Sequence, residues 1–284
     1  MTTLTGKTVL LTDASRGLGL HIAHALAKEQ ATVVCVSRFP SGLEPTCQAI
    51  NATGGRAIPI PFDITNVAQL SSLIQQVHAI VGHVDILINN AGIEINSAFA
   101  DYSLSEIQSV FKTNLLAAME LTRLLLPNMM ERGSGRIVNI ASLAGKKGVA
   151  FNSIYSASKA GLIMWADAVR QELAGRDVNI SVVCPEYISE TGMTIDPCVS
   201  APKLAGMSTP KGVANAVMRA IKGKQTQIIV NHNPIMEGLT KLMLAMGQIA
   251  PTVVDTLYRW LGIVNFNQRR AENRRNFRYA AIGR

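Results

Sequence analysis

Short apolar runs rich in β-branched residues alternate along this chain with longer stretches in which apolar residues recur every three or four positions. The short runs are typical of buried strands, and the longer stretches are typical of helices that cover a sheet. Their alternation predicts an α/β fold, namely a doubly wound parallel sheet of seven strands. The expected strands occupy 7–12, 32–37, 56–61, 84–89, 136–141, 178–184 and 226–231. The expected helices occupy 17–29, 41–53, 66–81, 103–131, 153–175 and 210–223.

The residues after the last expected strand follow a different pattern. From 235 to 264, apolar side chains form a stripe at helical spacing, and no further strand follows them. Pro251 is expected to divide this stretch into two helices or to kink a single one. We therefore expect a sheet domain over 1–231 and a C-terminal extension over 232–284, which consists of amphipathic helices and an arginine-rich tail.

The net charge of +8 is concentrated at the C-terminal end. Between 265 and 284 there are six arginines and one acid, Glu272, so this tail contributes +5 of the total. The favoured interpretation is a helix pair packed on the core or on a sister subunit, followed by a solvated tail. The alternative is a peripheral membrane contact, with the apolar stripe on a bilayer and the arginines against anionic head groups. A membrane-spanning helix is not expected, because no apolar run approaches the ~20 residues that it needs.

Composition adds limits on compartment and partners. Hydrophobic residues make up 48% of the chain and charged residues 16%, which suits a single well-buried domain. The four cysteines form no CxxC pair, and Cys35 and Cys184 lie in apolar runs, so we expect reduced thiols in a cytoplasmic protein. No signal peptide is expected, since the first strand begins near Lys7. Neither a metal site nor a nucleic-acid partner is expected.

A glycine-containing loop follows the first expected strand and reads Thr12-Asp-Ala-Ser-Arg-Gly17-Leu-Gly19. Gly17 and Gly19 have no Cβ, so the backbone can approach a pyrophosphate closely and the next helix can pack against the sheet. The N-terminal amides of that helix would face the phosphates. An ordinary turn remains the alternative when the loop is taken alone.

A second candidate site lies on the expected helix 153–175. Tyr155 and Lys159 stand four residues apart, so both side chains leave one face of that helix. A nearby ammonium group favours the phenolate and is expected to lower the pKa of the tyrosine, which makes its hydroxyl an acid or a base near neutral pH. Ser142 follows an expected strand and could hold a substrate oxygen beside the phenol.

In this order the motifs resemble those of the short-chain dehydrogenase/reductase family, in its single-domain branch. The resemblance covers about the first 230 residues and implies a Rossmann-like fold. It rests on the glycine loop, Asp63, Asn89-Asn90-Ala91-Gly92, Asn114, Ser142 and the Tyr155/Lys159 pair.

The resemblance implies a catalytic set of Asn114, Ser142, Tyr155 and Lys159. Tyr155 would exchange a proton with a carbonyl or alcohol oxygen that Ser142 positions and polarises. Lys159 would lower the pKa of the tyrosine and bind the nicotinamide ribose. Asn114 would kink its helix and hold a water molecule that connects Lys159 with solvent.

The end of the second expected strand indicates which nicotinamide cofactor the chain prefers. It reads Ser37-Arg38 and carries no acid to bind a ribose 2′-hydroxyl. An arginine there suits a 2′-phosphate, and Arg16 is placed to help. We therefore expect NADP(H) rather than NAD(H). The expected cofactor contacts are Thr12, Asp13, Ser15, Arg16, Gly17, Leu18, Gly19, Ser37, Arg38, Asp63, Ile64, Asn90, Ala91, Gly92, Tyr155, Lys159, Pro185, Ile188 and Thr191.

Three acids depart from the family pattern and count against tight cofactor binding. Asp13 replaces the usual first glycine, although aspartate tolerates a left-handed backbone. Glu186 and Glu190 follow the sixth expected strand, where Thr191 stands one residue later than the family places its nicotinamide contact. These acids motivate an alternative, a non-catalytic nucleotide-binding or membrane-surface scaffold protein. Glu94, beyond the fourth strand, is expected to be solvated.

The function expected from these residues is that of an NADP(H)-dependent oxidoreductase that interconverts a carbonyl and an alcohol. An apolar lid near 187–210 favours reduction of a small hydrophobic ketone or aldehyde. A homodimer or homotetramer is expected in the cytoplasm, with peripheral membrane contact through the extension as the less favoured interpretation.

Overall fold

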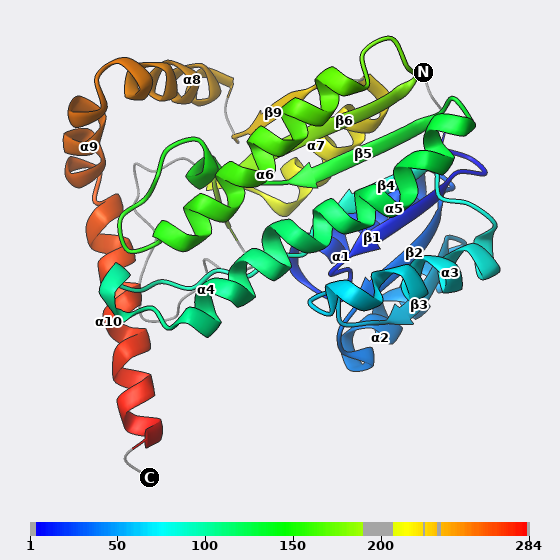
Figure 1. Cartoon of the computed structure of the whole chain (residues 1–284), viewed down its shortest axis with the longest axis horizontal. Coiled ribbons are helices and arrows are strands. Elements are labelled where there is room, and N and C mark those ends of the chain that lie inside the picture. The colour runs from blue at the N-terminus through cyan, green and yellow to red at the C-terminus, as the bar shows by residue number, and fades with distance from the viewer. Residues whose placement is uncertain (1–3, 190–206, 224, 232–233, 283–284) are drawn as a thin grey trace.

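The central element is a parallel sheet, seen in a computed structural model that describes residues 4–189, 207–223, 225–231 and 234–282. Within these residues seven strands pair in the order β3-β2-β1-β4-β5-β6-β9, and every pairing is parallel (Figure 1). The strand order reverses between β1 and β4, which opens a crevice at the carboxyl ends of the strands. The strands are β1 (Thr8–Thr12), β2 (Thr32–Ser37), β3 (Arg56–Pro61), β4 (Ile86–Asn89), β5 (Gly135–Ile140), β6 (Val178–Pro185) and β9 (Gln227–Val230). The predicted α/β class and the doubly wound, Rossmann-like sheet are confirmed.

Helices cover both faces of the sheet because successive strand residues point to opposite sides. Val9 and Leu11 pack with α1, α2 and α7 on one face, whereas Leu10 packs with α3, α5 and α6 on the other. All three strand residues are fully buried. The seven helices around the sheet are α1 (Gly17–Lys28), α2 (Pro40–Ala52), α3 (Leu70–Val81), α4 (Leu104–Phe111), α5 (Ala117–Glu131), α6 (Ser153–Glu172) and α7 (Pro210–Gly223).

The helix expected at 103–131 is interrupted. Helices α4 and α5 are joined by a π-helical turn, η3 (Lys112–Leu116), and Asn114 lies inside it. The side chain of Asn114 accepts a hydrogen bond from the Ile93 N–H (2.8 Å) and donates one to the Ile93 carbonyl (3.0 Å). A side chain tied to another segment in this way is a recognised cause of a helix irregularity. The resemblance had implied a kink at this residue, and the π-helical turn is found there.

The C-terminal extension forms three further helices, α8 (Pro234–Ile249), α9 (Pro251–Trp260) and α10 (Ile263–Ile282). They follow one another along one side of the molecule (Figure 1). Pro251 occupies the first turn of α9, where a missing N–H costs no hydrogen bond, so the expected division at this proline is found. The arginine-rich segment continues as α10, in which Arg269 and Arg275 are exposed as expected for a solvated tail, whereas Arg270 and Arg274 are not.

Helix α10 is held to the sheet domain by side chains on one of its faces. Arg270 pairs with Glu94, and Arg274 pairs with Glu106 on α4. The ring of Phe266 meets that of Tyr187 edge to face, with 5.3 Å between centroids. The positive charges of this tail were expected to face solvent, but two of them meet buried or half-buried carboxylates instead.

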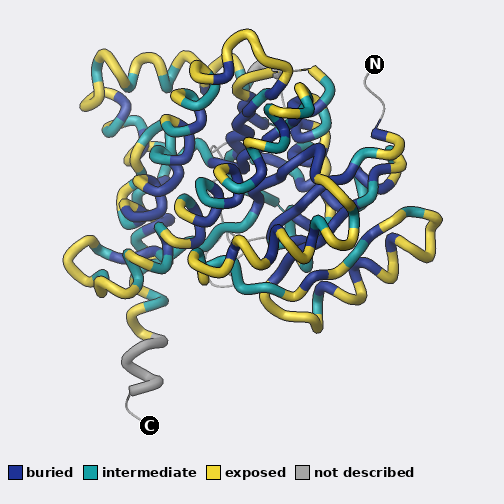
Figure 2. Tube along the Cα trace, turned by 45° about the vertical axis from the view of Figure 1, so that its right-hand side comes forward, coloured by how far each residue is buried: buried dark blue, intermediate teal, exposed yellow. Residues whose placement is uncertain are grey.

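Many residues along α8 and α9 are exposed (Figure 2), and several of these have large apolar side chains. They are Leu239, Leu242, Met246, Ile249, Val253 and Trp260. Among the residues that the structure describes, no helix is both long and apolar enough to cross a bilayer.

The packing of α10 can be tested at Asn267, which is fully buried. Its amide donates to the Tyr187 hydroxyl (3.3 Å) and accepts from the Asn96 amide (3.2 Å). In Asn267→Ala both partners lose a buried hydrogen bond, which costs about 1–3 kcal/mol. The melting temperature should fall by about 2–4 °C for each kcal/mol, measured by thermal unfolding. Asn276→Ala, on the exposed side of α10, is the matched control, and equal melting temperatures for the two variants would contradict this packing.

Candidate active site

The glycine loop between β1 and α1 has the backbone that a phosphate cradle needs. Asp13 and Gly17 both adopt positive φ angles, 54° and 56°, so aspartate does accommodate the left-handed conformation expected of it. A Cβ at Gly19 would lie 1.9 Å from the Asp13 carbonyl oxygen, so any side chain there would displace the loop. Helix α1 begins at Gly17, and its first N–H groups therefore face the crevice.

The segment after β4 supports this loop. The Asn90 amide donates to the carbonyl oxygens of Thr12 (3.0 Å) and Asp13 (3.2 Å). In return, the Thr12 hydroxyl accepts from the N–H groups of Asn90 and Ala91, both at 3.0 Å. These four predicted cofactor contacts are therefore brought together.

The acid at the start of the loop faces two of the predicted arginines. Burial raises the pKa of the Asp13 carboxyl, while the positive charges of Arg16 and Arg38 lower it. An acid buried here is thus partly compensated by the side chains that were expected to hold a 2′-phosphate.

Ser37 and Arg38 lie at the end of β2 as expected. The hydroxyls of Ser15 and Ser37 are 2.8 Å apart. The Arg38 guanidinium stacks over Phe39, at 4.7 Å from the ring centroid, and lies 4.0 Å from Asp63. Its side chain is 58% exposed, so an anion can reach it from solvent.

Asp63, another predicted cofactor contact, follows β3. Its carboxylate accepts from the N–H (2.9 Å) and the hydroxyl (2.8 Å) of Thr65, which forms a local turn before α3. Its neighbour Ile64 packs against the core. Thr191, the remaining predicted contact of the loop after β6, lies outside the described residues, as do Glu190 and most of the predicted lid.

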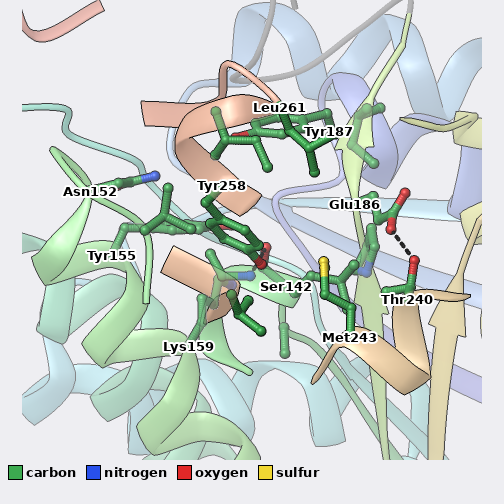
Figure 3. A pocket seen from close by; sticks show the side chains of 18 of the residues that line it. Ser142, Asn152, Tyr155, Lys159, Glu186, Tyr187, Thr240, Met243, Tyr258 and Leu261 are labelled. Carbon is green, nitrogen blue, oxygen red and sulfur yellow. Dashed lines mark hydrogen bonds between the residues drawn. The ribbon is translucent and has the colours of Figure 1, made fainter. Parts of the chain in front are cut away.

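The Tyr155/Lys159 pair occupies the buried face of α6 (Figure 3). The Lys159 ammonium lies 5.7 Å from the centroid of the Tyr155 ring. Ser142 follows β5, where its hydroxyl accepts from the Ala144 N–H (3.2 Å) and makes a hydrogen bond with the Tyr155 hydroxyl. The three side chains predicted to act together do meet.

The expected lowering of the tyrosine pKa is not found. Burial raises the pKa of Tyr155, and the Glu94 carboxylate raises it further, whereas the Ser142 hydrogen bond and the Arg270 charge lower it. Burial also lowers the pKa of Lys159 to about 8. The Lys159 ammonium donates to the Ile140 carbonyl (2.8 Å), so it is directed at the backbone as well as at the phenol. Desolvation of both groups therefore outweighs their mutual attraction.

Asn114 lies beside Lys159 at the edge of this site. Its amide donates to the Ser158 hydroxyl (3.0 Å) on α6. A Cβ at Gly92 would lie 3.3 Å from the Lys159 nitrogen and 3.5 Å from the Asn114 oxygen. A glycine at this position therefore lets the two side chains and the segment after β4 approach one another.

A cavity of about 410 Å³ extends from these residues to the C-terminal extension (Figure 3). Its inner wall includes the predicted residues Leu18, Asn90, Gly92, Ser142, Tyr155, Lys159, Pro185 and Ile188. Its outer wall is apolar and comes from α8, α9 and Leu261 directly after α9; the residues of the two helices are Met236, Leu239, Leu242, Met243, Met246, Val253, Val254 and Leu257. From the sequence, only the segment 187–210 was predicted to cover the substrate site, and this role of the extension was missed. The signal in the sequence that could have indicated this role is the apolar stripe at 235–264, because no further strand follows it to be covered.

Two acids of this cavity are engaged in ways that the sequence did not reveal. Glu94 was expected to be solvated, but its side chain is 6% exposed and paired with Arg270. Glu186 accepts from the Thr240 hydroxyl (2.9 Å) on α8 and from the Asn231 amide (2.9 Å). It therefore links the end of β6 to the extension.

Residues 7–197 match the family model described as short chain dehydrogenase. The chain therefore belongs to the short-chain dehydrogenase family and is an oxidoreductase of that family. Its extension lies beyond the matched residues.

Particular members of the family show how far the similarity reaches. Over 282 residues, 99% of this chain and 98% of the relative, the chain is 75% identical to the ketoacyl reductase HetN of Nostoc sp. strain PCC 7120. It is 34% identical over 189 residues, 66% of this chain and 76% of the relative, to the 3-oxoacyl-[acyl-carrier-protein] reductase FabG of Escherichia coli K12. A metagenomic short-chain oxidoreductase solved in complex with NADP superposes with a TM-score of 0.70 and 29% identity, covering 81% of this chain and 98% of that one.

The depressed pKa of Lys159 predicts a pH dependence of stability. Between about 8 and its ordinary value of 10.5 the folded state binds fewer protons than the unfolded state, so stability rises with pH in this window. Lys159→Met removes this contribution. The free energy of unfolding of the wild type, minus that of the variant, should rise by about 3 kcal/mol across the window. Denaturant unfolding at a series of pH values measures it, and a flat difference would contradict the burial of a neutral amine here.

Proposed function

We propose that this chain is an NADP(H)-dependent reductase that converts a hydrophobic ketone or aldehyde into an alcohol, and that its substrate is of the 3-oxoacyl type. The observation that carries the proposal is the meeting of Ser142, Tyr155 and Lys159 on the wall of a cavity that has apolar side chains opposite them. Ketoacyl reductase activity in the names of the relatives from Nostoc and Escherichia coli supports the acyl substrate.

The residues around the crevice fit a dinucleotide with a 2′-phosphate. The pyrophosphate would lie against Gly17 and the N–H groups that begin α1, where a Cβ is absent and the backbone is open. Arg38 and Arg16 would hold the 2′-phosphate, and the exposure of Arg38 supports this role. The complex of the metagenomic relative with NADP agrees with this assignment. When bound, NADPH supplies the hydride that reduces the carbonyl carbon.

Tyr155 acts as the general acid of the reduction. Its raised pKa keeps the phenol protonated at neutral pH, which is the state that donates a proton to a carbonyl oxygen. Ser142 holds that oxygen beside the phenol. Lys159 stabilises the phenolate that remains, and Asn114 orients the segment of α6 next to it through Ser158.

The apolar wall of the cavity sets the substrate class. Leu239, Leu242, Met246 and Val253 are exposed at the surface and also line the cavity, so they form an apolar mouth. An aliphatic chain attached to the carbonyl would leave the site through this mouth, and apolar burial would supply most of its affinity.

Tyr155→Phe tests the catalytic role. The ring and its packing remain, but no proton can be transferred, so reduction of ethyl 3-oxohexanoate by NADPH should fall by about 100-fold or more. NADPH should still bind, as measured by its fluorescence. Turnover near the wild-type rate would remove Tyr155 from the mechanism, whereas loss of NADPH binding would show that the variant disturbs the whole site.

Arg38→Gln tests the cofactor assignment. Loss of a charged hydrogen bond to the 2′-phosphate should weaken NADPH binding by roughly 10-fold or more and leave NADH binding unchanged. Fluorescence titration with each nucleotide measures both. Arg56→Gln is the matched control, because Arg56 is exposed at the start of β3, at the other end of the strands. A proportional loss for both nucleotides would show that Arg38 does not read the 2′ position.

A further inference from the structure

Arg270 reaches the active site from a helix that lies outside the residues matched by the family model. Its guanidinium forms two parallel hydrogen bonds with Glu94, at 3.1 and 3.2 Å. The side chains are 9% and 6% exposed, so this is a buried ion pair. The guanidinium also lies over the ring of Phe266, at 5.4 Å from its centroid. Helix α10 therefore contributes a fixed positive charge rather than a solvated one.

This ion pair is connected to the helix that carries the catalytic tyrosine. Oxygen Oε1 of Glu94, which faces Arg270, also accepts from the Asn152 amide (2.5 Å). Asn152 is the residue immediately before α6, three positions ahead of Tyr155. Glu94, Asn152 and Tyr155 all line the same cavity. Glu94 thus stands between the arginine and the start of the catalytic helix.

The charges of the pair act on Tyr155 in opposite directions. Glu94 disfavours the phenolate and Arg270 favours it. A buried carboxylate without its partner would oppose loss of the proton, and a buried guanidinium without its partner would promote it. The other charged or titratable groups that face the phenol are Lys159 on α6 and Cys184 on β6, and the Ser142 hydroxyl donates from the end of β5.

We propose that Arg270 is a positioning residue of the active site, which neutralises Glu94 beside Tyr155 and so holds the phenol in a state that can both give and recover its proton. This inference rests on the proposed role of Tyr155. The phenol must be reprotonated after each reduction and must be deprotonated for the reverse reaction. A nearby uncompensated carboxylate would hinder the second of these steps, so the site needs the charge that α10 supplies.

The experiment uses the full chain in the direction of alcohol oxidation, which needs the phenolate. The rate of oxidation of ethyl 3-hydroxyhexanoate by NADP⁺ is measured over a series of pH values for Arg270→Gln, Glu94→Gln and the double variant. In Arg270→Gln the rising limb of the pH profile should move up by about one pH unit, and in Glu94→Gln it should move down by about one unit. At a pH below the limb these shifts change the rate by about tenfold, in opposite directions. The double variant should return to the wild-type profile.

Two arginines of the same helix provide controls for a merely structural role. Arg274→Gln breaks an ion pair of α10 with Glu106, and loosens the same helix without leaving a charge beside Tyr155. Arg275→Gln removes a charge from its exposed side. Both should keep the wild-type position of the limb, even if Arg274→Gln lowers the melting temperature.

The inference would be overturned if the rising limb moved in the same direction in Arg270→Gln and Glu94→Gln, or if it moved in neither. It would also be overturned if the limb moved equally in Arg274→Gln. Tyr155→Phe separates this failure from failure of the proposed function. If Tyr155→Phe abolishes turnover while the two single variants do not move the limb oppositely, only the role of Arg270 is wrong. If Tyr155→Phe keeps its turnover, the proposed mechanism is wrong whatever the other variants do.

Discussion

The burial of Tyr155 and Lys159 is the constraint on which the rest of the site depends. Both groups lose their solvent, which raises the pKa of the phenol and lowers that of the amine to about 8. Two nearby contacts offset part of this cost. The Ile140 carbonyl accepts from the ammonium, and the Ser142 hydroxyl bonds to the phenol. Tyr155 and Lys159 are thus stabilised by protein groups in place of water. The ends of the strands, the interrupted helix at Asn114 and the absence of a side chain at Gly92 allow these groups to approach the pair.

The sheet could be predicted from the sequence because its signals are local. Period and composition mark each strand, and the alternation with helices requires the parallel order. The interruption of the helix expected at 103–131 was indicated only by the family resemblance, because it depends on Ile93, 21 residues away from Asn114. The ion pairs of the C-terminal tail were missed for the same reason. Nothing near Arg270 in the sequence indicates Glu94, which is 176 positions away.

The candidate site was predictable where a motif fixes both the residue and its place. Asn90 and Thr12 meet at the glycine loop because the carboxyl ends of β1 and β4 lie side by side. The sign of the tyrosine pKa shift was not predictable, because it depends on how far the pair is desolvated. A spacing of four residues shows that two side chains share a helix face, but it does not show how much water reaches that face.

The extension divides two tasks between its helices, and this explains its uneven sequence. Helices α8 and α9 are apolar because they form the outer wall of the cavity, and Glu186 ties α8 to the end of β6 through Thr240. The inner face of helix α10 meets Glu94 and Glu106 through two arginines, while Arg269 and Arg275 are exposed. Part of the stripe, such as the buried Val254, and two of the arginines, Arg270 and Arg274, thus have partners within the chain. The apolar side chains at the mouth of the cavity are the part of the stripe that a hydrophobic substrate would meet first.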